Sequence, residues 1–407
     1  MSPITRLRLF YAYGFLSSAM LDQFVWMVYL TGRGYPASSV GLAMLAFSIA
    51  YVIFNVPSSY LSDLLGRRPF LVLGPFAKVI SAFLFLDAGS LGIVLAGTAC
   101  AGAAFAIVTG TEEACFHDVL VSCGQEGRVN DRLSLFASAQ VLGNTLGGLS
   151  GGFLAHVSYR LLYLAEAAVS ALTIVAALFI PVAPGTGDGA RTGCSLASQT
   201  ADAIKTLESS YTQGTRFSGF LALSVASWTV YWLGRDLVQP VLGAHDIDPA
   251  VISSVFTAGG LALIAGRRIA GHFDAREHTR GFSMHMLPLA AAATAGGILG
   301  LAYPPSRPIW ILAMAVTLVA GRLVSAYGSQ IQEVWLLDNA PAGLKATTLS
   351  LVDSATVLFN GVCFYLLGLV AAECGTPVPL LILALACLGL HFLWRTWLHG
   401  ARSGRRA

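Results

Sequence analysis

Long apolar segments alternate with short polar connections along almost the whole chain. Each segment holds about 20 residues with few charges, the length that an α-helix needs to cross the hydrocarbon core of a bilayer. The pattern predicts twelve membrane-spanning helices, at residues 8–30, 38–61, 69–88, 91–116, 133–157, 160–182, 217–242, 249–270, 282–302, 308–335, 347–371 and 376–398. The expected fold class is an all-α membrane protein, because helices satisfy their backbone polar groups without water.

One connection is longer and more polar than the others. Residues 184–216 separate the sixth and seventh predicted helices and are rich in Gly, Ser and Thr. This composition is typical of a flexible linker. It predicts an N-terminal six-helix bundle at 1–183, a cytoplasmic linker at 184–216 and a C-terminal six-helix bundle at 217–407.

The two predicted bundles share a short repeat. The segment LSLFASAQVLGN at 133–144 matches LSLVDSATVLFN at 349–360 in eight of twelve positions, at an offset of 216 residues. The repeat makes the fifth and eleventh predicted helices equivalent. A duplication of six helices about an axis along the membrane normal is a transporter architecture, with its site at the interface between the halves.

The composition also favours a membrane protein. Of the 407 residues, 56% are hydrophobic and 11% are charged, whereas soluble proteins carry about 25% charged residues. The net charge of +3 is small and no basic run is interleaved with aromatic residues, so no nucleic-acid partner is expected. The seven cysteines form no C-x-x-C pair, so neither a zinc site nor a disulfide framework is predicted.

The basic residues predict the orientation. If both termini are cytoplasmic, most of the 24 Lys and Arg residues fall on the cytoplasmic side, and only Arg33, Arg160 and Arg307 fall in outer loops. This bias follows the positive-inside rule. We therefore expect a monomeric multi-pass protein of the cell (inner) membrane with cytoplasmic termini, whose N-terminal apolar segment is retained as the first helix.

A charged loop between the second and third predicted helices carries a family signature. The segment SYLSDLLGRRP resembles the G-x-x-x-D-R-x-G-R-R loop of the major facilitator superfamily, with Ser59 and Leu64 as departures. The matching residues are Asp63, Gly66, Arg67 and Arg68. The resemblance implies two pseudo-symmetric six-helix bundles and a cytoplasmic gate made by these four residues, joined by Asp118. Paired carboxylates and guanidinium groups could lock and release such a gate; the alternative is that the arginines only anchor the topology.

A second signature lies in the fifth predicted helix. The segment GNTLGGLSGG resembles the glycine motif of the superfamily's drug/proton antiporters, with Gly148 in place of Pro. The matching residues are Gly143, Gly147, Gly151 and Gly152. Small residues at this spacing let another helix pack closely. The resemblance implies export, and the alternative is ordinary small-residue packing.

Charges inside predicted helices are costly and therefore candidates for function. The proton-coupling candidates are Asp22, Glu112 and Glu113. The substrate-binding candidates are Gln23, Trp26, Trp228, Trp232, Arg235, Asp236, Gln239, Arg322 and Ser325. The resemblance implies that the first, fourth, seventh and tenth helices, which carry these residues, line a central cavity.

Some alternatives remain open at these positions. Asp22 is expected well inside a helix, on one face with Ser18 and Trp26. The two glutamates could instead be solvated at the inner interface, and Arg235 with Asp236 could only hold the outer side closed. A metal site is not expected, since the residues EEACFHD have no matching ligands elsewhere. Glu166 and Asp353 receive no role.

No phosphate-binding loop of the G-x-x-x-x-G-K-[ST] type is present, so no nucleotide cofactor is expected. The energy for transport would come from an ion gradient, most simply protons. We therefore expect a secondary active transporter, not an enzyme, that exports a small amphipathic drug or metabolite in exchange for protons. The alternatives are a proton-coupled importer of a small organic solute, or a membrane-embedded enzyme or binding protein that uses the cavity.

Overall fold

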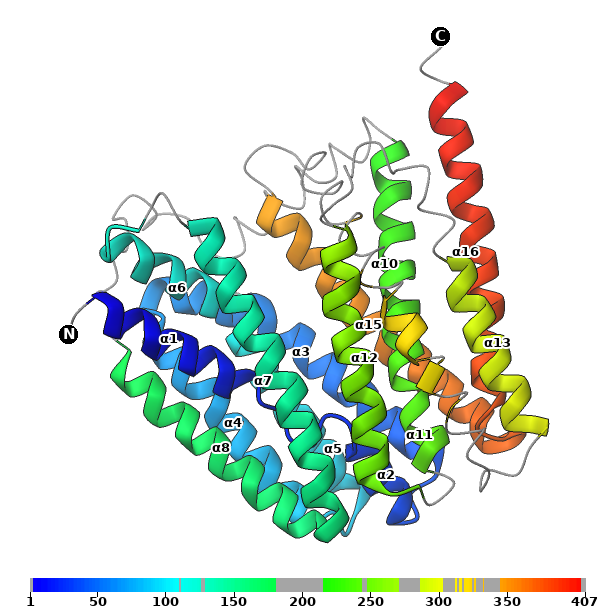
Figure 1. Ribbon diagram of the computed structural model, residues 1–407, viewed down its shortest axis with the longest axis horizontal. Coiled ribbons are helices and arrows are strands. Elements are labelled where there is room, and N and C mark those ends of the chain that lie inside the picture. The colour runs from blue at the N-terminus through cyan, green and yellow to red at the C-terminus, as the bar shows by residue number, and fades with distance from the viewer. Residues whose placement is uncertain are drawn as a thin grey trace. The chain divides into compact units, whose positions relative to one another are not determined.

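The structure is a computed structural model that describes residues 3–109, 111–125, 129–180, 215–243, 247–270, 286–302, 312, 315–316, 318–323, 326, 332 and 345–403. The described residues form helices joined by short turns, as the apolar pattern predicts (Figure 1). Seven of the described helices are long and apolar enough to cross a membrane. The chain is thus an all-α membrane protein. Most of the predicted linker and of the tenth predicted helix lies outside the described residues.

The helices follow the predicted order closely. In the first half they are α1 (Pro3–Ser18), α2 (Trp26–Gly32), α3 (Ala37–Leu65), α4 (Arg68–Leu86), α5 (Leu91–Val108), α6 (Thr111–Ser122), α7 (Val129–Val157) and α8 (Tyr159–Phe179). In the second half they are α10 (Thr215–Asp236), α11 (Val238–Gly243), α12 (Pro249–Ala270), α13 (Met286–Ala302), α15 (Lys345–Cys374) and α16 (Val378–Ser403).

Three predicted helices are broken into two. The first divides into α1 and α2, the fourth into α5 and α6, and the seventh into α10 and α11. The prediction of an unbroken first helix is therefore wrong, and Asp22 lies in the break rather than on a helical face with Ser18 and Trp26. Apolar length predicts that a segment spans the membrane, but a break needs partners for the freed backbone groups, and those come from other helices.

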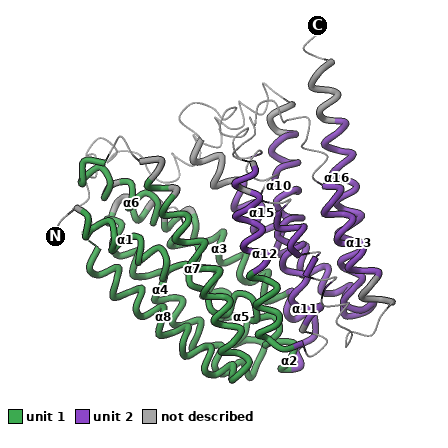
Figure 2. The backbone as a smooth tube through the Cα atoms, in the orientation of Figure 1, with its two compact units in different colours: residues 1–33, 42–193, 248–257 green, residues 34–41, 194–247, 258–407 purple. Residues whose placement is uncertain are grey.

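The chain divides into two compact units (Figure 2). The first contains the described residues of 1–33, 42–193 and 248–257, and the second contains those of 34–41, 194–247 and 258–407. A short segment from each half of the sequence thus belongs to the unit formed mainly by the other half: 34–41 to the second unit and 248–257 to the first. The offset of 216 residues maps 34–41 onto 250–257, so the two exchanges are equivalent in the repeat.

Close glycine contacts repeat the same relation inside each unit. In the first unit, a methyl group on Gly152 of α7 would collide with Ser253 of α12. In the second unit, a methyl group on Gly368 of α15 would lie 2.7 Å from the carbonyl oxygen of Ala37 of α3. An offset of 216 residues relates both members of one contact to those of the other. The duplication predicted from one short segment therefore extends to packing.

An aromatic core holds α1 in the first unit. The rings of Phe10 and Phe116 lie 5.0 Å apart, and those of Phe116 and Phe136 lie 4.9 Å apart, so α1, α6 and α7 meet there. Tyr13 donates a hydrogen bond to the carbonyl oxygen of Leu71 at 3.2 Å, which connects α1 to α4. This packing fixes the first membrane helix up to its break.

Candidate functional site

The break in the first membrane helix is an irregular segment at residues 19–25. Helix α1 ends at Ser18, and the carbonyl oxygen of Asp22 accepts bonds from the N–H groups of Val25 and Trp26, both at 2.9 Å, where α2 begins. The N–H of Leu21, between these turns, donates to Oε2 of Glu166 at 2.6 Å. A side chain from another helix thus satisfies a backbone group that the break frees.

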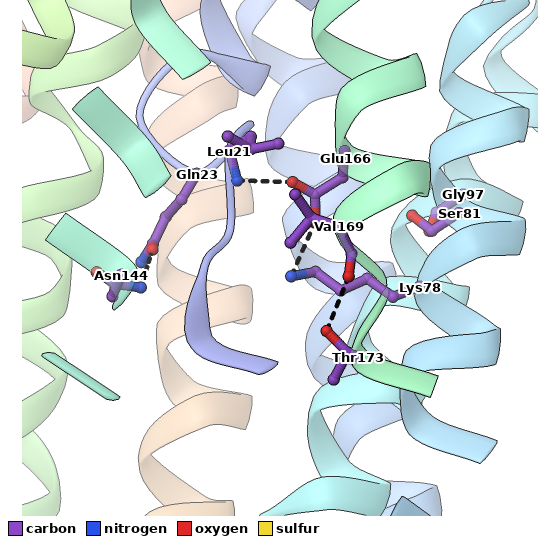
Figure 3. A network of polar contacts seen from close by, with 9 residues as sticks. All are labelled: Leu21, Gln23, Lys78, Ser81, Gly97, Asn144, Glu166, Val169 and Thr173. Carbon is purple, nitrogen blue, oxygen red and sulfur yellow. Dashed lines mark hydrogen bonds and ion pairs between the residues drawn. The ribbon is translucent and has the colours of Figure 1, made fainter. Parts of the chain in front are cut away.

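Glu166 is held between two partners (Figure 3). Its carboxylate, on α8, is almost fully buried, with 1% of the residue exposed. Besides the N–H of Leu21, it binds Nζ of Lys78, from α4, at 2.9 Å. A buried ion pair with an added backbone donor is a strong, directional arrangement.

Asp22 belongs to the same charged cluster. The charged groups that act on its carboxylate are Glu166 and Lys78. When all three side chains are charged, the cluster carries one excess negative charge. Such a charge inside a membrane bundle is costly unless a proton or another cation neutralises it. We call Asp22, Lys78 and Glu166 the hinge triad.

Sequence reasoning selected Asp22 and left Glu166 without a role. Lys78 and Glu166 could have been selected together, as two opposite charges inside predicted membrane helices. An acid in the sixth predicted helix and a base in the third, both far from the ends, need each other to enter a membrane. The sequence alone does not show that the two side chains meet, because 88 positions separate Lys78 from Glu166.

The other predicted residues at this break also find partners. Gln23 accepts a hydrogen bond at Oε1 from Nδ2 of Asn144, on α7. Trp26 is half-buried at the start of α2. Asn144 ends the repeated segment of the first half, and sequence reasoning did not select it. The break therefore carries the amide pair Gln23–Asn144 on one side and the pair Lys78–Glu166 on the other (Figure 3).

Glu112 and Glu113 have different surroundings although they are neighbours on α6. Glu112 is buried, with 4% of the residue exposed, and accepts a hydrogen bond from Nε2 of Gln140 at 2.7 Å. The side chains of Ser17 and Tyr13, from α1, also face it. Glu113 is exposed. Burial therefore separates the two proton-coupling candidates.

In the second unit, the end of α10 carries the predicted seventh-helix residues. Arg235 forms an ion pair with Asp236, and its guanidinium carbon lies 4.9 Å from the ring centre of Trp232. Nδ2 of Asn360, on α15, donates to Oδ2 of Asp236 at 3.3 Å. Gln239 is buried on α11. These residues form one neutral cluster of charges, amides and an aromatic face.

The remaining substrate-binding candidates are less fully placed. Trp228 is half-buried on α10, one turn before Trp232. Arg322 is half-buried, and a methyl group on Gly259 of α12 would lie 3.3 Å from its Cγ. Ser325 lies outside the described residues.

The predicted gate loop is anchored within the first unit. Gly66 has a positive φ of 89°, which lets α3 turn into α4. Arg67 donates to the carbonyl oxygen of Ala114, on α6, and Arg68 to that of Leu178, on α8. The side chains of Asp63 and Asp118 lie outside the described residues. The gate role of this loop stays a prediction.

The glycines of α7 pack directly on the first membrane helix, a partner that the sequence did not identify. A methyl group on Gly143 would collide with the carbonyl oxygen of Phe15, and one on Gly151 with that of Leu21. Gly147 faces the backbone of Ala19. The glycine face therefore brings the backbone of α7 against both α1 and the break.

Comparisons with known proteins agree with this architecture. The chain is similar in structure to the nucleoside transporter NupG, with a TM-score of 0.77 and 14% identity over 97% of this chain and 100% of that chain. It is also similar to a D-xylose-proton symporter, with a TM-score of 0.69 and 14% identity over 96% of each chain. For a POT family transporter in complex with 5-aminolevulinic acid, the TM-score is 0.66 and the identity 13%, over 97% of this chain and 95% of that chain.

At these identities the likeness shows the fold alone. A comparison with curated proteins found no significant match. The sequence model of the Major Facilitator Superfamily, however, matches residues 9–335, which is most of the chain. The chain belongs to the Major Facilitator Superfamily.

Proposed function

We propose that this protein is a secondary active transporter of the drug/proton antiporter type, which exports a small amphipathic molecule in exchange for protons by alternating access. The observation that carries the proposal is the hinge triad at the break in the first membrane helix. A transporter needs a titratable group that responds to both gradient and substrate, and a discontinuous helix is where such folds place it.

Asp22 is the proposed exchange site. The excess negative charge of the triad can be neutralised by a proton, or by the cationic group of an arriving substrate. Because one charge is expensive in a low-dielectric interior, binding either cation disfavours the other. This competition converts proton entry into substrate release. Glu112, buried beside Gln140, is the second proton-coupling candidate.

The proposed substrate contacts follow from the polar groups at the two breaks. Gln23 and Trp26 contribute an amide and an aromatic ring at the first break, while Trp232 and Arg235 contribute an aromatic face and a cation at the second. Aromatic surface with a few charges suits an amphipathic molecule. The proposal includes a monomer in the cell membrane, with cytoplasmic termini and a cytoplasmic gate at Asp63, Gly66, Arg67, Arg68 and Asp118.

The test starts with purified protein in proteoliposomes that contain a pH-sensitive dye. Compounds are screened for substrate-dependent proton movement. With a substrate identified, Asp22→Asn should abolish transport driven by a proton gradient, because the amide keeps the size of the side chain but cannot titrate. Exchange of labelled for unlabelled substrate needs no net proton movement, so it should survive. Uphill transport that is unchanged in Asp22→Asn removes Asp22 from the coupling role.

Proton-coupled import of a small organic solute is the second candidate. Gly148 stands where the antiporter motif has Pro, and the same buried charges would serve symport equally well. Everted membrane vesicles decide between the two directions. An exporter accumulates substrate inside everted vesicles when their lumen is acidified, whereas an importer releases it.

A further inference from the structure

We propose that Glu166, paired with Lys78, is a clasp on the break in the first membrane helix, and that a proton on Glu166 opens it. Glu166 is then a positioning residue, acting through the backbone at Leu21 rather than by touching the substrate. Nothing in the family signatures selects this pair. The inference rests on the proposed proton coupling only for its role in transport.

The geometry of the carboxylate supports this role. Its Oε2 takes the N–H of Leu21 at 2.6 Å, and its Oε1 lies 2.9 Å from Nζ of Lys78. Both interactions are strongest when the carboxylate is ionised, because a charged acceptor makes a shorter and stronger hydrogen bond with the N–H of Leu21 and attracts the ammonium group of Lys78. A proton on Glu166 would weaken the first bond and remove the charge attraction in the second. Both effects free the segment between α1 and α2.

The charge balance explains how the clasp could switch. The titratable and charged groups around Glu166 are Lys78 of α4, Asp22 of the break, Tyr163 of α8 and, beside that ring, Tyr29 of α2. While Glu166 is ionised, Lys78 is its counter-ion at 2.9 Å and the clasp stays closed. When Glu166 holds a proton, it loses its charge attraction for Lys78 and the clasp opens. A proton on Asp22 instead removes a second negative charge near Lys78 and leaves Lys78 paired with Glu166.

The amide pair at the same break supplies a contrast. Gln23 and Asn144 do not titrate near neutral pH, so their bond holds one end of the segment at every pH. The glycine contact of Gly151 with the carbonyl of Leu21 limits how far the segment can move toward α7. Protonation of Glu166 therefore releases the side of the break that faces α4 and α8.

Hydrogen exchange measured by mass spectrometry tests the clasp without any substrate. The full-length protein is placed in lipid nanodiscs, and exchange of peptides that cover residues 19–25 is followed from acidic to alkaline pH. Rates are corrected for the intrinsic pH dependence of exchange with the unfolded peptide. In the wild type we expect protection at Leu21 to fall about tenfold or more at acidic pH, the order expected for losing a hydrogen bond to a charged group.

Three variants separate the roles. Glu166→Gln should show weak protection at Leu21 that does not change with pH, because a neutral amide oxygen accepts a weaker hydrogen bond and has no charge attraction for Lys78. Glu166→Asp keeps the charge, so it should keep a pH dependence with a weaker clasp. Asp22→Asn should also keep a pH dependence, since it leaves the carboxylate of Glu166 and both of its partners in place. Glu113→Gln is the control: it removes an exposed acid of the same unit and should leave the protection of residues 19–25 as in the wild type.

The outcomes are decisive in either direction. Protection that does not change with pH in the wild type overturns the clasp, as does an unchanged pH dependence in Glu166→Gln. Loss of the pH dependence in Asp22→Asn alone would assign the proton to Asp22 and also overturn it. If Glu166→Gln does not fold, the wild type, Glu166→Asp and Asp22→Asn still decide. A failed transport assay would contradict only the proposed function, because the hydrogen-exchange measurement of the clasp involves no transport.

Discussion

The breaks in the first and seventh membrane helices occupy equivalent places in the repeat but are built differently. The first spans residues 19–25, whereas the second is confined to Leu237, whose N–H still donates to the carbonyl oxygen of Leu233 at 2.9 Å. An offset of 216 residues relates Gln23, inside the first break, to Gln239, two residues after the second. The first break therefore exposes backbone that other helices must bind, and the second does not.

The charges differ in the same way. At the second break Arg235 and Asp236 are adjacent in the sequence and neutralise each other. At the first, the charges come from the break, α4 and α8, and their sum is one excess negative charge. A repeated asparagine, Asn144 or Asn360, binds a polar side chain at each break. The comparison suggests that the first break is where charge can change, while the second keeps a constant one.

The largest expected effect comes from removing the cation of the first break. Lys78→Met would leave Glu166 buried without its counter-ion, which typically costs about 3–5 kcal/mol. We expect a large fall in thermal stability in detergent, followed by intrinsic fluorescence. The double variant Lys78→Met with Glu166→Gln should recover most of the loss, because Glu166 then no longer carries a buried charge without its counter-ion. A double variant as unstable as the single one would contradict a charge origin.

The repeated asparagines should differ in their contributions to stability. Asn360 donates to a buried carboxylate, and hydrogen bonds to charged groups contribute about 1.5–3 kcal/mol. Asn144 donates to a neutral amide, for which about 0.5–1.5 kcal/mol is typical. We therefore expect Asn360→Leu to lower the melting temperature more than Asn144→Leu. Equal losses would show that the two breaks are electrostatically alike.

The glycine face distinguishes the first break by its packing. Gly151→Ala would push a methyl group into the carbonyl of Leu21, and overpacking of this kind costs about 1–3 kcal/mol. The equivalent position in the second half is Leu367, so that break is packed by a side chain instead. The neighbouring Ser150 is exposed, so Ser150→Ala, as the matched control, should change stability by less than about 0.5 kcal/mol. Similar melting curves for both variants would exclude close backbone packing.

The smallest effect is expected at the outer ends of the helices. His156 Nδ1 lies 2.6 Å from an oxygen of Asp248, and both side chains are well exposed, at 57% and 39%. Exposed pairs contribute about 0–1 kcal/mol, so His156→Gln should lower the melting temperature in detergent only slightly. A loss as large as that of Gly151→Ala would contradict this expectation. The repeat equivalent of His156 is Ala372, so the second half has no such pair at that position.

Much of the fold could be predicted from local sequence. Apolar length predicted the described helices to within a few residues in most cases, because crossing a bilayer sets the number of residues directly. The match between 133–144 and 349–360 predicted a duplication. The segments exchanged between the two units and the equivalent contacts of Gly152 and Gly368 follow the same offset. The glycine face at Gly143 and Gly151 could also be predicted, since helical spacing places these small residues on one side of the helix.

The tertiary structure alone decided how the first membrane helix is broken and what holds it there. The apolar run from 8 to 30 does not predict the end of α1 at Ser18, because hydropathy carries no information on whether a helix is continuous. Asp22 was identified as costly from its position, but its partners were not. Lys78 and Glu166 lie on helices that pack side by side only after folding. An ion pair between such distant positions produces no periodic pattern in the sequence. Local sequence therefore determined which segments enter the membrane, and long-range packing determined which buried charges neutralise one another.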